Sequence, residues 1–143
     1  MAGEIELGAI HHLRLTVTDI ERSRKFYTQL LGFDVAVEAP ESDDPKSDPS
    51  YPVLWGGAVM AKGIYLLGLR PVAAKSDRFD EDRVGLDHLS FSVESRAALD
   101  EAIRTLDQHK VPHGEPRELT SFGICVLPFR DPDNIQLELT SPL

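Results

Sequence analysis

The chain contains an internal repeat, and this feature restricts its fold more than any other. The segments Ile10–Val17 and Leu86–Val93 share one pattern, in which apolar residues stand at alternate positions, as in a strand with one buried face. Aligning His12 with His88 also superposes three apolar pairs: Leu13 with Leu89, Leu15 with Phe91, and Val17 with Val93. A repeat of this kind predicts two copies of one structural unit.

Each predicted strand leads directly into a predicted helix. In the first copy Thr18 and Glu21 have the spacing of a capping box, an apolar stripe follows, and Gly32 ends the helix. In the second copy Ser95 is placed to cap a helix that ends before Gly114. The two copies therefore agree in their second element as well as their first.

Three short strand-like segments follow each helix. They are 34–38, 53–59 and 63–69 in the first copy, and 117–120, 123–127 and 135–140 in the second. The chain is therefore predicted to be α+β, with two tandem βαβββ repeats at about 8–70 and 84–143 inside a single domain of residues 1–143. Residues 70–83 are the predicted linker, and residues 40–52 form an irregular acidic stretch that is either a solvated loop or a lid.

The alternation also sorts side chains by face. His12 and Arg14 lie opposite the apolar face of the first strand, His88 has the equivalent position in the second copy, and Glu138 lies on the polar face of the last strand. The helices should cover the apolar faces, so His12, His88 and Glu138 are expected together on the uncovered side. Two imidazoles and a carboxylate suit a divalent metal with open coordination positions. A solvated polar face explains the same pattern equally well.

These residues resemble the vicinal oxygen chelate superfamily, which contains glyoxalase I, bleomycin-resistance proteins, fosfomycin-modifying enzymes and extradiol dioxygenases. The matching stretches are His12 to Asp19, Phe26-Tyr27 with Leu31-Gly32, Gly85 to His88, Asp131-Pro132-Asp133, and Leu137-Glu138-Leu139. The resemblance covers essentially the whole chain. It implies curved mixed sheets around a central cavity, with the helices on the outside.

The resemblance also implies a ligand set. The metal-dependent members hold Zn, Ni, Mn or Fe through residues that correspond to His12, His88 and Glu138. His11 is set aside because the expected register turns it to the other face. Aligning Ile64 with Ile135 places Leu67 where Glu138 stands in the second copy, and a leucine there counts against a glyoxalase I or an epimerase.

Three further residues are predicted to contact a substrate. Arg14 shares the face of His12 and could hold a carboxylate or phosphate through two hydrogen bonds, or else form a salt bridge with an acid. Tyr65 and Leu67 are placed on the same face by alternation, which predicts an apolar part of the cavity. Trp55 either adds to this cavity or is an ordinary core aromatic.

Composition limits the partners. There are 15 Lys and Arg against 24 Asp and Glu, giving a net charge of −9, and no basic block, which argues against nucleic acid. Uncharged runs are far shorter than the roughly 20 residues that span a bilayer. A single cysteine, Cys125, excludes an internal disulfide and fits a reducing compartment. We expect a cytoplasmic protein without a membrane partner that binds a small molecule. The resemblance implies a homodimer, whose sites can be shared between chains.

Two functions fit this reading. The first is a metal-dependent lyase, transferase or oxygenase that chelates a small oxygenated substrate at the metal. The second is a metal-free protein that sequesters an antibiotic, as the bleomycin-resistance type does. The His and Glu set favours the enzyme, whereas the acidic charge suits a cationic drug.

Overall fold

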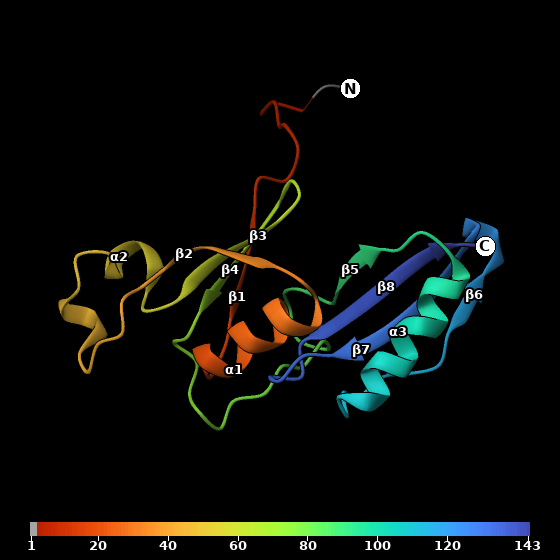
Figure 1. Cartoon of the computed structure of the whole chain (residues 1–143). Coiled ribbons are helices and arrows are strands. Elements are labelled where there is room, and N and C mark those ends of the chain that lie inside the picture. Colours follow the sequence, from red (N-terminus) through yellow and green to blue (C-terminus); the bar gives the residue numbers. More distant parts are fainter. Residues whose placement is uncertain (1–2) are drawn as a thin grey trace. The chain divides into compact units, whose positions relative to one another are not determined.

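The repeat is visible in the three-dimensional structure. A computed structural model describes residues 3–143, and the chain divides into two compact units, the first ending at Asp77 and the second beginning at Arg78. This boundary lies within the predicted linker. Each unit has one four-stranded mixed sheet and one principal helix, so the α+β class and the repeated βαβββ order are confirmed (Figure 1).

The first unit builds its sheet in the order β1-β4-β3-β2. Strand β1 runs parallel to β4, and the other neighbours are antiparallel. The elements are β1 (Leu13–Thr16), α1 (Ile20–Lys25) with a π-helical turn (Phe26–Leu30), β2 (Asp34–Glu38), a 3₁₀ turn (Pro45–Ser47), α2 (Tyr51–Leu54), β3 (Ala58–Lys62) and β4 (Tyr65–Arg70).

The second unit repeats this topology in the order β5-β8-β7-β6, again with a parallel pair, β5 and β8. Its elements are β5 (Leu89–Ser92), α3 (Arg96–Gln108), β6 (Arg117–Leu119), a 3₁₀ turn (Thr120–Phe122), β7 (Ile124–Arg130) and β8 (Gln136–Pro142). The two units therefore share strand order as well as strand directions.

Side-chain caps fix where the two principal helices begin. Ser95 accepts a hydrogen bond from the Ala98 N–H and caps α3, as predicted. For α1 the predicted cap is wrong by one residue, because Asp19 accepts from the Arg22 N–H at 3.0 Å. Among the described residues, 3–143, no helix is long and apolar enough to cross a membrane.

The segment 53–59 was expected to be a strand, and its first half is not. Val53 belongs to the short helix α2, whose first turn holds Pro52, a residue that favours the start of a helix. Trp55 then adopts a left-handed backbone conformation with φ of 58°, which ends the helix. Strand β3 begins only at Ala58, after Gly56 and Gly57.

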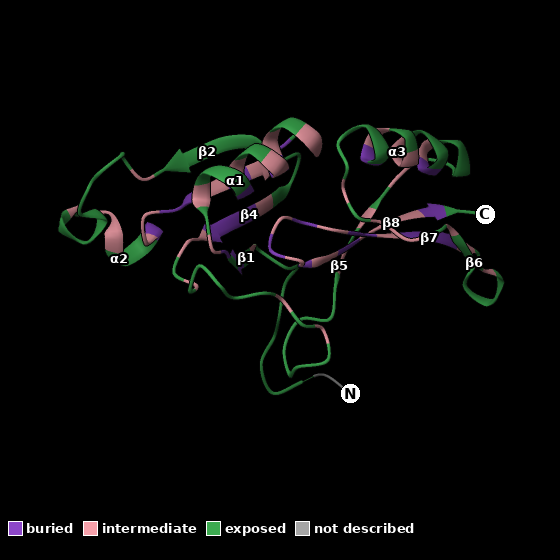
Figure 2. Ribbon diagram, turned by 90° about the horizontal axis from the view of Figure 1, so that it is seen from below, coloured by how far each residue is buried: buried purple, intermediate pink, exposed green. Residues whose placement is uncertain are grey.

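Each sheet has one apolar face, which its helix covers. In the first unit Leu15, Leu67 and Leu69 are buried, and register pairs Leu13 with Leu67 and Leu15 with Leu69. In the second unit Leu137 is fully buried beneath α3. Strand β2, at the edge of the first sheet, is exposed along its whole length and is green in Figure 2. The opposite face of each sheet is left uncovered by its own helix.

Candidate functional site

Two of the three predicted metal ligands meet on the uncovered face of the second sheet. His88 lies directly before β5 and Glu138 lies in β8, and parallel pairing sets Ser90 of β5 beside Glu138. Nε2 of His88 is 3.8 Å from Oε1 of Glu138. Both residues line a cavity of about 340 Å³. The other lining residues are Asp87, Glu115, Arg117, Val126, Pro128 and Gln136.

A neighbouring carboxylate orients the imidazole of His88. Oδ1 of Asp87 lies 2.5 Å from Nδ1 of His88 and also accepts a hydrogen bond from the Gln136 side-chain amide at 3.2 Å. A carboxylate only accepts, so Nδ1 carries the proton. This hydrogen bond leaves Nε2 on the side of the ring that faces Glu138. Asp87 was not among the predicted site residues, although an acid directly before a candidate ligand is a visible signal in the sequence.

The hydroxyl of Thr140, itself paired with that of Ser90, holds the carboxylate of Glu138. Thr140 donates from Oγ1 to Oε1 of Glu138 at 3.2 Å, and the hydroxyls of Ser90 and Thr140 are 2.6 Å apart. Glu138 is also the less exposed of the pair, with 18% of its side chain accessible against 40% for His88. These contacts fix one carboxylate oxygen on the sheet.

The pair fits two positions of a divalent metal site. Zinc bonds to His nitrogen and carboxylate oxygen are about 2.0–2.2 Å long, so two such ligands at a tetrahedral angle lie about 3.4 Å apart. The observed 3.8 Å separation is close to this value and too long for a hydrogen bond between the two side chains. Within residues 3–143, no group of three or more His, Cys, Asp or Glu side chains converges in the arrangement of a metal site.

His12, the third predicted ligand, belongs to the first unit. It lies immediately before β1, is exposed, and its Nδ1 is 2.9 Å from Nδ1 of His11. The two rings meet edge to face with centroids 5.2 Å apart. His11 was expected to face away from His12, whereas the two rings are in contact.

The residue equivalent to Glu138 in the first unit is Gly68, which corrects the expectation of Leu67. Leu13 pairs with Leu67 in the first unit, and Leu89 pairs with Leu137 in the second. Leu67 therefore matches Leu137, and the next residue, Gly68, matches Glu138. The alignment of Ile64 with Ile135 was off by one because Ile64 is 88% exposed in a turn while Ile135 is buried.

The same register corrects the expected face of Tyr65 and Leu67. Leu67 pairs with Leu13 and is 2% exposed, so it lies in the core on the face covered by α1. Tyr65 lies two residues before Leu67 and shares its face, at the exposed start of β4. Both residues therefore lie opposite Arg14, not beside it.

Arg14 lies across Gly68 on the uncovered face of the first sheet. A Cβ atom at Gly68 would be 2.9 Å from Nε of Arg14, so the missing side chain makes room for the guanidinium. Nη1 of Arg14 donates to the carbonyl of Val53 in α2 at 3.0 Å. The corresponding pair in the second unit is Ser90 and Glu138.

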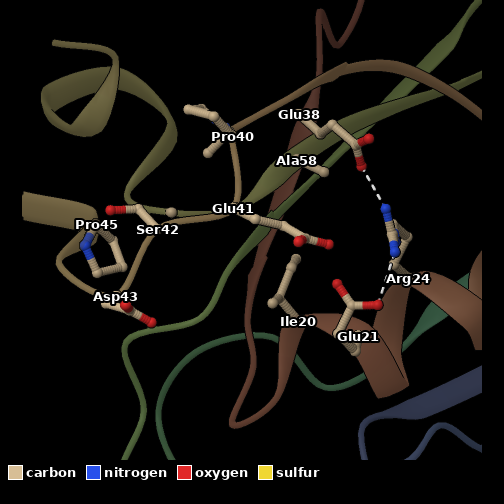
Figure 3. A pocket seen from close by; sticks show the side chains of 13 residues that line it. Ile20, Glu21, Arg24, Glu38, Pro40, Glu41, Ser42, Asp43, Pro45 and Ala58 are labelled. Carbon is tan, nitrogen blue, oxygen red and sulfur yellow. Dashed lines mark hydrogen bonds and ion pairs between the residues drawn. The ribbon is translucent and has the colours of Figure 1, made fainter. Parts of the chain in front are cut away.

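A cavity of about 770 Å³ lies elsewhere in the first unit, between α1 and the segment that follows β2 (Figure 3). Arg24 pairs there with Glu21 at 2.7 Å and with Glu38 at 2.5 Å. The carboxylates of Glu41 and Asp43 add negative charge to its lining. None of the predicted site residues lines this cavity.

Comparison with known proteins decides the family. The model of the Glyoxalase/Bleomycin resistance protein/Dioxygenase superfamily matches residues 9–139. The chain belongs to this superfamily. Its relatives include the protein YwkD of Bacillus subtilis (strain 168), which is 31% identical over 93% of this chain and 96% of YwkD.

Solved structures agree with this membership. A glyoxylase/bleomycin resistance protein/dioxygenase domain from Frankia sp. EAN1pec is 31% identical, with a TM-score of 0.74, covering 96% of this chain and 94% of that one. The fosfomycin resistance protein FosX from Listeria monocytogenes has a TM-score of 0.72 at 14% identity, and the match covers 96% of this chain and 94% of FosX. Lactoylglutathione lyase from Agrobacterium tumefaciens has a TM-score of 0.67 at 20% sequence identity, and the match covers 94% of each chain. The last two likenesses show the fold alone, which in this superfamily serves proteins with different names and reactions.

Proposed function

We propose that the protein is a metal-dependent enzyme of this superfamily, a lyase, transferase or oxygenase that acts on a small oxygenated molecule. The divalent ion would be held by His88 and Glu138 of the second unit and by His12 of the first. The observation that carries the proposal is the approach of His88 to Glu138, with Asp87 fixing the imidazole. The assignment of His12 rests on the family resemblance.

A divalent ion at these residues supplies Lewis acidity for a substrate that offers two neighbouring oxygens. The chain's own contribution is to hold the donors in place before the ion arrives. Asp87 keeps the proton of His88 on Nδ1, and Thr140 keeps the carboxylate of Glu138 turned toward Nε2. A metal site held by three protein ligands leaves positions for substrate oxygens.

Gly68 supports an enzyme with three protein ligands. Superfamily members of the glyoxalase I and epimerase kind resemble each other in using a side chain at this position in the first repeat, and glycine has none. We therefore propose a reaction other than theirs, with Zn, Ni, Mn or Fe as the ion. A homodimer whose sites are shared between chains belongs to the same proposal.

The test is the metal content of untagged protein purified without chelator, measured by mass spectrometry. We expect about one ion per chain in the wild type, and loss of that ion in His88→Ala and in Glu138→Gln. His109→Ala is the matched control, because His109 is an exposed histidine at the end of α3 and should leave the metal content unchanged. Full metal content in His88→Ala would overturn the assignment.

The alternative is a metal-free protein that sequesters a cationic drug. It is favoured by the net charge of −9 and by the acidic lining of the cavity beside α1. Failure of the protein to take up any of the four ions after reconstitution would support this function over the enzyme. Binding of a cationic antibiotic by the same preparation, measured by calorimetry, would then establish it.

A further inference from the structure

Two arginines of the first sheet converge on one short turn. Nη1 of Arg14 donates to the carbonyl of Val53, and Cζ of Arg70 lies 3.9 Å from the centroid of the Trp55 ring. Val53 and Trp55 are two residues apart at the end of α2. Register sets Arg14 beside Gly68 in β4, two residues before Arg70, so both side chains rise from the same uncovered face.

Both guanidinium groups keep most of their hydrogen-bonding capacity unused. Each has five N–H donors. Arg14 uses one of them, and Nε of Arg70 is buried without any partner. Within the described chain, residues 3–143, neither group has a carboxylate within ion-pair distance, whereas Arg24, Arg104 and Arg130 all pair with acids. This contrast is notable in a chain where acids outnumber bases by 24 to 15.

Neighbouring residues determine the positions of the two guanidinium groups. A cation–π contact with Trp55 holds the Arg70 guanidinium over the indole ring. The absence of a side chain at Gly68 gives the Arg14 side chain its path across β4. Both guanidinium groups keep N–H donors without an acceptor, and an oxyanion would supply acceptors for them.

We propose that Arg14 and Arg70 form a binding site for an oxyanion, the carboxylate or phosphate group of a small molecule. A planar guanidinium matches both groups through two parallel hydrogen bonds. If the oxyanion is part of an enzyme substrate, this proposal rests on the proposed function, and it predicts that the substrate carries a negative charge. Binding of the oxyanion itself does not require the metal.

Trp55 provides a direct test because it is the only tryptophan in the chain. Its fluorescence is recorded on the full chain after chelator treatment, while inorganic phosphate or, separately, acetate is added at constant ionic strength maintained with NaCl. We expect a saturable change with at least one of the two anions. The anion that saturates at lower concentration identifies the phosphate or the carboxylate class.

Three variants make the test specific. Arg14→Gln leaves the contact between Arg70 and Trp55 in place and should raise the apparent Kd by tenfold or more. Arg70→Ala should abolish the saturable signal. Arg83→Ala is the control, because it removes one positive charge from a side chain that is 84% exposed and lies in the second unit, and it should bind as the wild type does.

A linear response to both anions in the wild type would overturn the proposal. An unchanged Kd in Arg14→Gln would overturn it as well, even if Arg70→Ala failed to fold. Because the titration is made without metal, its failure leaves the metal assignment untouched. If the metal assignment proves wrong, a saturable titration that depends on Arg14 would still support the oxyanion site.

Discussion

Asp87 holds the imidazole of His88 by accepting a hydrogen bond from Nδ1 at 2.5 Å. Asp87→Asn keeps the size of the side chain but removes the charge and can present an N–H to Nδ1. We expect the affinity for a divalent ion to fall by about 10- to 100-fold, as for other carboxylates that orient a metal-binding histidine. Competition with a fluorescent chelator measures this affinity.

The control for this variant is Asp82→Asn, because Asp82 is an exposed acid in the predicted linker. It should leave metal affinity unchanged. Equal affinities for Asp87→Asn and the wild type would show that Asp87 has no part in orienting His88.

Gly57 packs too closely against its neighbours to accept a side chain. A Cβ atom there would lie 1.9 Å from the carbonyl oxygen of Leu69 and 2.9 Å from Cδ of Pro71. We expect Gly57→Ala to lower the free energy of unfolding by about 3 kcal/mol, the upper part of the range for overpacked sites. Urea unfolding followed by circular dichroism measures the change. Gly8→Ala is the control, since a Cβ at Gly8 would meet nothing within 4 Å; equal stability of the two variants would contradict the packing argument.

The pair of Arg130 and Glu81 predicts loss of stability in acid. Nη1 and Nη2 of Arg130 donate to the two carboxylate oxygens of Glu81, and these bonds lower the pKa of Glu81 from 4.5 to about 2. Because the pKa of Glu81 is lower in the folded protein than in the unfolded chain, the ionised carboxylate stabilises the fold at pH values above about 4.5. This stabilisation is lost as the pH falls from about 4.5 to 2. The Tm of Glu81→Gln should lie below that of the wild type at pH 7, and the difference should shrink at pH 3. A difference that is constant with pH would rule out this explanation.

His113 predicts the opposite pH dependence. Its Nδ1 is 2.7 Å from the Gly114 carbonyl oxygen and its Nε2 is 3.1 Å from Oδ1 of Asp107. Both partners accept, so both ring nitrogens must donate, and these bonds raise the pKa of His113 above 6.5. The stabilisation is complete below pH 6.5 and is lost as the pH rises through the folded pKa. We expect the Tm difference between the wild type and His113→Gln to be larger at pH 5.5 than at pH 9, in thermal unfolding scans; a larger difference at pH 9 would contradict the assigned contacts.

The sequence predicted the repeat and the βαβββ order of its elements well, because period-2 alternation and helix caps are local signals. It set His88 and Glu138 on one side of the second sheet, and their side chains lie 3.8 Å apart. It failed where the outcome depended on pairing between strands. The alignment of Ile64 with Ile135 was reasonable by residue type, yet one residue of offset moved Leu67 from the core to the expected site. Register comes from contacts between β1 and β4, which no single segment of sequence reveals.

Other features could not be predicted because they depend on contacts between particular side chains. The start of α2 was not predicted because its apolar residues also suit a strand, although Pro52 in its first turn favours a helix. Asp87 and Trp55 acquire their importance only from the rings and guanidinium that they contact. Such contacts depend on rotamers, which sequence periodicity does not specify.

The relation between Gly68 and Arg14 limits how this repeat can evolve. Replacing Gly68 with glutamate would make the first repeat match the second at this position, but its Cβ would collide with Arg14. The Arg14 side chain would therefore have to shift away from β4, and its hydrogen bond to Val53 depends on the path that it would leave. Any residue other than glycine at this position would thus disturb the link between β1 and α2, so the two halves differ here for a reason local to the first sheet.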